Sequence, residues 1–230
     1  MEITFWLERW NNNQTGFHQQ KINPYLMYFF GDKGPAVEQR DRLKVFVPLC
    51  GKSKDMLWLS QNNYRVFGVE CSDRAVQGFF EENALNYKHA EKDQHALYQS
   101  SDLPSLIEIF QGDFFELQAS DLDDVTDIFD RASLVALPVD MRQRYADKMA
   151  ELLKPGVRTL LVTLNFDQAE MNGPPFSVTE DEVNALYADN FTVQKLLNKE
   201  VIEEEPGLKN RGLTSLVETV YKLVRKSAVM

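Results

Sequence analysis

The chain has 230 residues, 43% of them hydrophobic, which is enough for one large domain with a substantial core. Its formal net charge of −10 and its pI of about 4.9 disfavour binding to nucleic acid or any other polyanion. An acidic chain of this size is typical of an ordinary soluble protein.

The sequence carries no signal for export or membrane insertion. No apolar run approaches the roughly 18 residues of a membrane span. Glu2 and Glu8 lie where a signal peptide would be basic and apolar. The cysteines and histidines lack the spacing of a disulfide framework or a metal site. We expect a cytoplasmic protein without a bound metal or membrane partner, and nothing in the sequence requires more than a monomer.

Residues 1–30 are rich in aromatic side chains. Trp6 and Trp10 are spaced to share one face of a short helix, which residues 11–13 end. A loop around Phe17 and a second helix ending near Phe30 are expected to follow. Most of these rings are expected to cover one edge of the core. Trp10 and Phe17 flank a polar segment, and such a segment can close over a bound ligand.

The stretch 43–73 has the pattern of a nucleotide-binding βαβ unit. The apolar run Val45–Val47 ends in a turn that contains Gly51, an amphipathic helix follows, and a second apolar run ends at Glu70. Gly51 permits a tight turn and a close backbone approach to a ligand. Ser53 or Asp55 can cap the helix. Glu70 comes about 20 residues after the glycine, where an acid can accept hydrogen bonds from ribose hydroxyls.

The turn has one glycine, and this narrows the choice of ligand. The Gly-x-Gly-x-x-Gly pattern of dinucleotide-binding proteins is absent, and Phe46 occupies a position where a P-loop needs glycine. A turn with fewer glycines suits a ligand without a pyrophosphate, such as S-adenosylmethionine. From this stretch alone, a plain α/β unit whose Glu70 faces solvent fits as well.

The rest of the chain alternates helices and strands. We expect a Ser72-capped helix over 74–86, a polar excursion over 87–104, strands at 106–110 and 126–130, a helix over 142–153, a strand at 157–164, a helix over 179–188, and two last strands at 191–197 and 215–223 with an exposed loop at 203–207. Helix-linked strands followed by a closing hairpin predict one α/β domain with a mostly parallel sheet and a late antiparallel strand. The S-adenosylmethionine-dependent methyltransferases have this arrangement.

Three positions beyond strand ends are candidate site residues. Asp113 follows the third strand and either holds an adenine amino group or serves as a turn residue. Arg131 follows the fourth strand beside Asp130, where open α/β sheets bind ligands, although a surface ion pair of the two is the alternative. Phe176 ends the stiff loop 172–176 and can form the wall of a pocket.

Several motifs, in order across nearly the whole chain, resemble those of bacterial thiopurine S-methyltransferases. They are Phe5-Trp6 with Trp10, Gly16-Phe17-His18, the segment Val47-Pro48-Leu49-Cys50-Gly51-Lys52-Ser53, Gly68-Val69-Glu70, Asp130-Arg131-Ala132 with Leu137, Gly173-Pro174-Pro175-Phe176 and Val220-Tyr221. The Pro-Leu-Cys-Gly-Lys turn is the most specific. The resemblance implies a single domain over 1–230 with a seven-stranded Rossmann-like core at 43–223, helices on both faces of the sheet, and the aromatic leader as a lid.

The resemblance also assigns residues. It implies contacts to S-adenosylmethionine, and to its product S-adenosylhomocysteine, at Trp10, Leu49, Gly51, Glu70, Gly112, Asp113 and Arg131. It places the substrate near Phe17 and near a second arginine, for which Arg211 is the weaker match. Their places beyond strand ends make Arg131 and Phe176 further candidates for substrate contact, and we expect Arg131 and Arg211 to be the catalytic residues. The expected substrate is a small-molecule thiol or chalcogen compound.

The expected chemistry is an in-line displacement by a sulfur nucleophile. Aligning the reactants and excluding water can supply roughly 7–11 kcal/mol, so no dedicated base is required, and His18 is expected to be structural. Alternatives are a methyltransferase for halide, thiocyanate or tellurium and selenium oxyanions, and a nucleotide-binding module without turnover. A dinucleotide oxidoreductase is disfavoured by the missing glycines.

Overall fold

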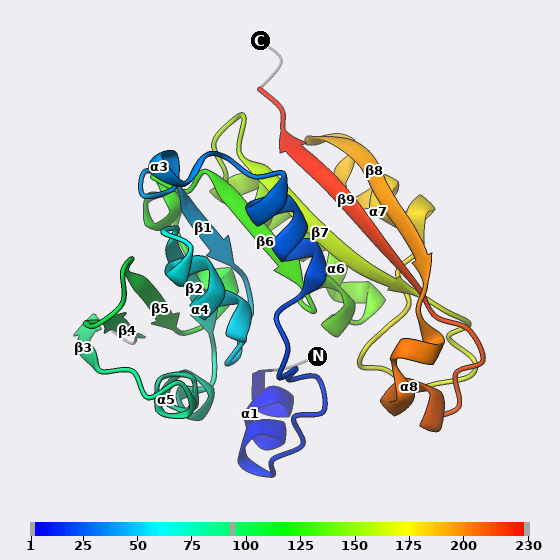
Figure 1. Ribbon diagram of the computed structural model, residues 1–230. Helices are drawn as coiled ribbons and strands as arrows, with labels where there is room; N and C mark the ends of the chain where they lie inside the picture. The colour runs from blue at the N-terminus through cyan, green and yellow to red at the C-terminus, as the bar shows by residue number, and fades with distance from the viewer. Residues whose placement is uncertain (1–2, 93–94, 228–230) are drawn as a thin grey trace. The chain divides into compact units, whose positions relative to one another are not determined.

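The computed structural model describes residues 3–92 and 95–227 (Figure 1). The chain divides after Phe129 into two compact units. We call these the amino-terminal unit and the carboxy-terminal unit and describe each by itself. Their boundary falls within the strand β6 (Asp127–Arg131). The single-domain organisation stays a prediction.

Parallel strands form the core of the amino-terminal unit. β1 (Lys44–Val47) lies between β2 (Arg65–Glu70) and β6, and β5 (Ile107–Gln111) pairs with the far edge of β2, all in parallel register. All four residues of β1 are buried, as expected for a parallel strand covered on both faces. The predicted βαβ unit is therefore confirmed.

Two serine caps begin the helices of this unit. Ser53 accepts a hydrogen bond from the Asp55 amide and starts α4 (Lys54–Gln61), and Ser72 accepts one from the Ala75 amide and starts α5 (Asp73–Glu82). Both helices contact β2 and β5. The carboxylate of Asp55, the other candidate cap, instead accepts a hydrogen bond of 2.8 Å from the Asn23 amide and so fastens the leader to α4. The helix α5 ends four residues before its predicted end.

The polar excursion predicted over 87–104 is wrong. Its described residues form a hairpin of β3 (Tyr87–Lys92) and β4 (His95–Ser100), and β4 pairs antiparallel with β5. The hairpin raises the number of strands in the described residues to nine, where seven were predicted. Edge strands often carry charged and polar side chains, which discourage pairing with another chain, and this composition hid the hairpin.

The aromatic leader is helical only in part. The predicted first helix is confirmed as α1 (Ile3–Asn11). The second begins at the cap Asn23 as the short α2 (Pro24–Leu26) and continues as a π-helical segment (Met27–Asp32), before α3 (Val37–Arg40) leads into β1. Leu26 of α2 and Phe30 of the π-helical segment are apolar side chains buried in the core.

The carboxy-terminal unit is built around an antiparallel ribbon (Figure 1). β9 (Val217–Arg225) lies between β7 (Arg158–Asn165) and β8 (Phe191–Glu200) and runs antiparallel to both, which confirms the late antiparallel strand. The helices α6 (Val139–Leu152) and α7 (Glu180–Tyr187) occur at the predicted places, and Thr179 caps α7.

The exposed loop predicted at 203–207 is wrong in part. The segment folds as a 3-10 turn (Ile202–Glu204) and the short helix α8 (Pro206–Asn210). Proline suits the first turn of a helix because it lacks the amide hydrogen that would be unpaired there. Apolar residues on either side of this segment, Val201, Ile202, Leu213 and Leu216, pack together and hold it down. Further 3-10 turns lie at Phe114–Glu116, Ala119–Leu122 and Leu134–Ala136.

None of the helices in the described part of the chain has the length and apolar character needed to cross a bilayer. Within residues 3–92 and 95–227, no three His, Cys, Asp or Glu side chains are grouped as a metal site requires.

Candidate active site

The turn after β1 has an unusual backbone, and at Gly51 it leaves no room for a side chain. Leu49 and Gly51 both have positive φ, 45° and 51°. A Cβ atom on Gly51 would lie 3.1 Å from a ring carbon of Trp10, and its backbone is in the left-handed region that glycine adopts without strain. The amide of Cys50 bonds to the Val69 carbonyl at 2.9 Å, so the turn stays against the end of β2.

Glu70, the last residue of β2, ties this end of the strand to the turn. Its Oε2 accepts a hydrogen bond from the Gly51 amide at 2.9 Å, and its Oε1 accepts one from the Ser72 amide at 2.8 Å. The Cys71 thiol also donates to Oε1, at 3.3 Å. Glu70 is only 5% exposed, and burial raises the pKa of its carboxyl, against the effect of these hydrogen bonds.

Aromatic rings of the leader cover the same turn. Trp10 is 4% exposed and packs edge-to-face against Phe17, with ring centroids 5.3 Å apart. Phe17 also contacts Trp6, at 5.6 Å. The Lys52 ammonium lies 5.8 Å from the Trp10 ring. The two residues that the sequence singled out in the leader therefore meet over the glycine turn.

Salt bridges tie the turn and the leader to α5. Lys52 pairs with Glu82 at the end of α5, and His18 Nε2 lies 3.6 Å from the same carboxylate. A phosphate-binding loop would offer such a lysine to its ligand, whereas here a carboxylate holds it. This contact gives His18 a structural partner.

Gly112 and Asp113 lie beside Glu70 at the end of β5. The Gly112 amide bonds to the Glu70 carbonyl at 3.0 Å. A Cβ atom on Gly112 would lie 2.6 Å from His95, so a larger residue does not fit. The Asp113 side chain accepts a hydrogen bond of 2.9 Å from the Phe115 amide and caps a 3-10 turn, which is the turn role that the sequence left open. Its contact with adenine stays a prediction.

Arg131, the last residue of β6, belongs to the carboxy-terminal unit and is half-buried. Its neighbour Asp130 is 1% exposed and accepts a hydrogen bond of 2.8 Å from the Tyr145 hydroxyl. Successive side chains of a strand point to opposite faces, so this arrangement disfavours the ion pair of Asp130 with Arg131 that the sequence left open. Burial raises the pKa of Asp130 to about 6.

The loop after β7 carries Phe176 and is bound by Arg211. The Phe176 amide bonds to the Val135 carbonyl at 2.7 Å, and its ring lies where a Cβ on Gly173 would be only 2.3 Å away. Arg211 is exposed at the end of α8, and its guanidinium donates to the carbonyls of Asn172, at 2.9 Å, and Pro174, at 3.2 Å. Arg211 thus fastens the loop, and its catalytic role stays a prediction.

The family model for thiopurine S-methyltransferases matches residues 1–226. The chain belongs to the thiopurine S-methyltransferase family.

Relatives in this family match at full length. The thiopurine S-methyltransferase of Pseudomonas fluorescens (strain SBW25) is 44% identical over 226 residues, which are 98% of this chain and 100% of the relative. That of Nitrosospira multiformis is 40% identical over 228 residues, 99% of this chain and 100% of the relative.

Solved structures agree on the fold. A SAM-dependent methyltransferase from Anabaena variabilis superposes with a TM-score of 0.62 at 15% identity, covering 97% of this chain and 95% of that one. The 1,6-didemethyltoxoflavin-N1-methyltransferase of Burkholderia thailandensis, with bound S-adenosylhomocysteine, gives 0.61 at 14% identity and covers 98% of this chain and 87% of that one. The fold is thus the Rossmann-like methyltransferase fold, as predicted, and the chain is an S-adenosylmethionine-dependent methyltransferase.

The amino-terminal unit of this thiopurine S-methyltransferase family member suits S-adenosylmethionine. A side chain at Gly51 would collide with the ring of Trp10, and the Gly51 amide donates a hydrogen bond to the buried carboxylate of Glu70. Each carboxylate oxygen of Glu70 has two lone pairs. Oε1 already accepts two hydrogen bonds, from Ser72 and Cys71, whereas Oε2 accepts one, from Gly51, so Oε2 can accept a further hydrogen bond from a ribose hydroxyl. The lysine of the turn is already paired and the turn has no second glycine, which fits a ligand without phosphates.

Sequence reasoning missed the buried polar side chains of α6. Arg142 and Tyr145 are polar, and both are buried. They share one helix face with the buried apolar residues Ala146 and Met149. An arginine in line with the apolar face of a helix was the signal that could have found Arg142. Its partners were not readable, because they come from segments far along the chain.

Proposed function

We propose that this enzyme transfers the methyl group of S-adenosylmethionine to the sulfur of thiopurines or related aromatic and heterocyclic thiols. The observation that carries the proposal is the full-length match to relatives named thiopurine S-methyltransferase, at up to 44% identity with complete coverage. The Gly51–Glu70 contact supports it, because it holds the turn next to a buried carboxylate, as a cofactor site requires and a surface loop does not.

Bound S-adenosylmethionine supplies a methyl group on a sulfonium centre, already activated for displacement by a thiolate. The residues proposed to hold it are Trp10, Leu49, Gly51, Glu70, Gly112 and Asp113 in the amino-terminal unit. Glu70 fixes the ribose by accepting hydrogen bonds from its hydroxyls, and the ring of Trp10 excludes water from the turn. Cys71 is a donor rather than a nucleophile, since burial and the neighbouring Glu70 raise the pKa of its thiol.

Arg131 is the residue proposed to favour the anionic acceptor. A guanidinium keeps its charge at any relevant pH and presents a planar set of donors, so it lowers the pKa of a nearby thiol without taking part in proton transfer. Phe17 and Phe176 are proposed to contact the ring of the acceptor.

A panel of acceptors tests this proposal. Methyl transfer from labelled S-adenosylmethionine is measured to 6-mercaptopurine, thiophenol, iodide, thiocyanate, selenite and tellurite. We expect the highest kcat/KM for the two aromatic thiols. A higher kcat/KM for an inorganic acceptor would assign the enzyme to the alternative class, and cofactor binding without transfer to any acceptor would favour the binding module.

A further inference from the structure

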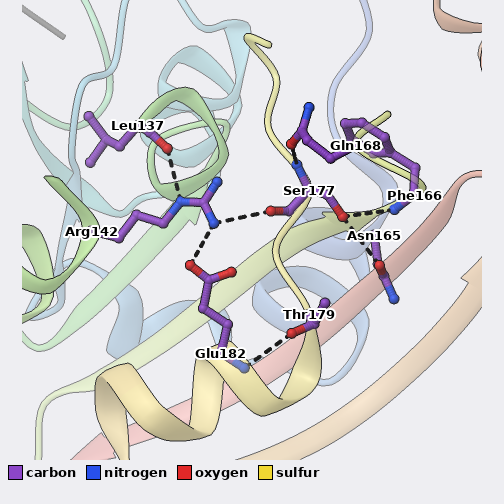
Figure 2. A network of polar contacts seen from close by, with 8 residues as sticks. All are labelled: Leu137, Arg142, Asn165, Phe166, Gln168, Ser177, Thr179 and Glu182. Carbon is purple, nitrogen blue, oxygen red and sulfur yellow. Dashed lines mark hydrogen bonds and ion pairs between the residues drawn. The ribbon is translucent and has the colours of Figure 1, made fainter. Parts of the chain in front are cut away.

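A buried arginine holds the loop that carries Phe176 (Figure 2). Arg142 of α6 is 3% exposed. Its Nε donates to the Leu137 carbonyl at 2.9 Å, and its Nη1 donates to the Ser177 carbonyl at 3.1 Å and to Glu182 Oε1 at 2.6 Å. One guanidinium therefore joins the segment before α6, the end of the loop after β7, and the first turn of α7.

Ser177 anchors the loop on its other side. Figure 2 shows its amide donating to Gln168 Oε1, at 2.8 Å, and its hydroxyl accepting from the Phe166 amide, at 3.0 Å. The next residue continues the attachment, because the Val178 amide bonds to the Leu164 carbonyl at 2.7 Å. The residue directly after Phe176 thus has little freedom to move.

The ring of Phe176 is held by the same arrangement. The Arg142 guanidinium lies 5.9 Å from its centroid, and the backbone of Gly173 packs so closely that a Cβ there would lie 2.3 Å from the ring. The ring is nevertheless only half-buried. A fixed, partly exposed aromatic ring is a preformed flat surface for a ligand.

The network requires an arginine rather than any cation. A buried charge is costly unless it is paired and its donors are satisfied. Glu182 supplies the charge, and the backbone carbonyls of Leu137 and Ser177 satisfy donors pointing in other directions. A lysine offers a compact ammonium without the planar fork, so it cannot reproduce these directions together.

On the basis of the function proposed above, we infer that Arg142 is a positioning residue for the acceptor. It fixes Phe176 as a flat wall, and this wall favours planar aromatic thiols over small aliphatic ones. Neither Arg142 nor Glu182 touches the acceptor, and both act through the ring.

The test compares Arg142→Lys with the parent on 6-mercaptopurine and on 2-mercaptoethanol. We expect KM for 6-mercaptopurine to rise about 10-fold, because the Phe176 ring loses its fixed position and stacks less well on the acceptor. KM for 2-mercaptoethanol and the Kd for S-adenosylhomocysteine should stay within about twofold, since neither depends on the wall. Phe176→Leu should reproduce this change in selectivity, and Glu182→Gln, which keeps the hydrogen bond but removes the charge, should show it in weaker form.

Arg225→Lys is a matched control. Arg225 also binds carbonyls, those of Ala150 at 3.0 Å and Asn190 at 3.1 Å, and lies 5.7 Å from the ring of Phe191, but it has no contact with the Phe176 loop among its described bonds. The Arg225→Lys variant should lower Tm as Arg142→Lys does. It should leave the ratio of the KM values for 6-mercaptopurine and 2-mercaptoethanol unchanged.

Two outcomes separate this inference from the proposed function. Equal loss on both thiols in Arg142→Lys, or the same selectivity change in Arg225→Lys, would make Arg142 a stabilising residue only and overturn the inference. The Glu182→Gln variant decides the matter in the same way if Arg142→Lys does not fold. Failure of the unmodified enzyme to methylate either thiol would instead overturn the proposed function.

Discussion

Glu70 combines two demands that conflict at the scale of a single residue. Its carboxylate must be ionised to hold the turn and to accept ribose hydroxyls, yet it is buried. Desolvation raises its pKa, and the hydrogen bonds from Ser72, Cys71 and Gly51 lower it again. Ligand hydroxyls add further donors, so binding should favour the ionised form.

Glu70→Gln should weaken S-adenosylhomocysteine binding about 10- to 100-fold at neutral pH, because a charged acceptor is worth about 1.5–3 kcal/mol. In the parent, affinity should fall as pH drops through the raised pKa of Glu70, and the variant should lack this dependence. Isothermal titration calorimetry between pH 5 and 8 measures both effects. Glu200→Gln is the control, since Glu200 also binds a backbone amide, that of Leu216, away from the site. Unchanged affinity in a folded Glu70→Gln variant contradicts the assignment.

Arg131 is expected to act on the ionisation of the acceptor. Arg131→Ala should shift the pH–rate profile for 6-mercaptopurine to higher pH, because the thiol loses a neighbouring positive charge. Arg131→Lys should keep the profile if charge dominates, and should raise KM as Ala does if planar recognition dominates. Thiocyanate, ionised throughout, serves as the acceptor without a titrating thiol. A parent-like rate with Arg131→Ala from pH 6 to 9 would remove the residue from substrate handling.

Asp130 carries a stability cost that depends on pH. Its folded pKa of about 6 lies above 3.8, the ordinary value of an aspartate, so the folded state binds the proton more tightly and stability falls as pH rises between these values. Asp130 accepts hydrogen bonds from the hydroxyls of Tyr145 and Ser133 and from the Leu134 amide, and burial together with the charge of Asp130 raises the pKa of Tyr187.

Asp130→Asn should therefore stabilise the protein relative to the parent, by up to about 3 kcal/mol, as pH rises from 4 to 7. The two proteins should converge near pH 4, where Asp130 is protonated. Urea unfolding at several pH values tests this, and Tyr145→Phe should enlarge the difference, because the Tyr145 hydroxyl is a donor that lowers the pKa of Asp130. A constant difference between parent and variant at every pH would show that Asp130 does not titrate in this range.

At the scale of elements, α1 and the turn after β1 depend on each other. The helix contributes Trp10, whose ring lies against Gly51, and the segment after it contributes Phe17, which packs on Trp10. Trp10 is the one buried residue within the described residues of α1. A short helix held by one ring opens at low cost, as a lid must.

Hydrogen exchange of residues 3–18 should slow on addition of S-adenosylhomocysteine, because a ligand on the turn adds contacts to Trp10. The helix α7, outside this region, serves as the internal reference. Trp10→Ala should abolish the added protection and weaken binding about 2- to 30-fold, the range expected for loss of a cation–π contact with the sulfonium. Equal exchange with and without ligand would exclude a lid.

At the scale of the whole molecule, ligand binding should raise thermal stability. A ligand at 100 times its Kd stabilises the native state by about 2.7 kcal/mol, which corresponds to roughly 5–10 °C in Tm for a chain of this size. Differential scanning fluorimetry with S-adenosylhomocysteine should show this shift, and NADH at the same concentration should not. An equal shift with NADH would favour a dinucleotide enzyme.

Local signals in the sequence were sufficient for most elements. Ser53 and Ser72 cap their helices as the sequence indicated, because a cap depends only on residues two or three positions away. The apolar run Val45–Val47 is a buried strand for a similar reason. The hairpin β3–β4 was missed, since its polar strands gain their order from pairing with β5 rather than from their own composition.

The sequence by itself determined the fold class, the family and the positions of Gly51 and Glu70, because these depend on periodicity and on motifs of adjacent residues. Only the tertiary structure decided which side chains meet. It placed Trp10 on Gly51, gave Asp130 to Tyr145, and joined Arg142 to Ser177 and Glu182. Contacts between residues 35 and 40 positions apart, as in the Arg142 network, have no local signature, since they exist only after the chain has folded.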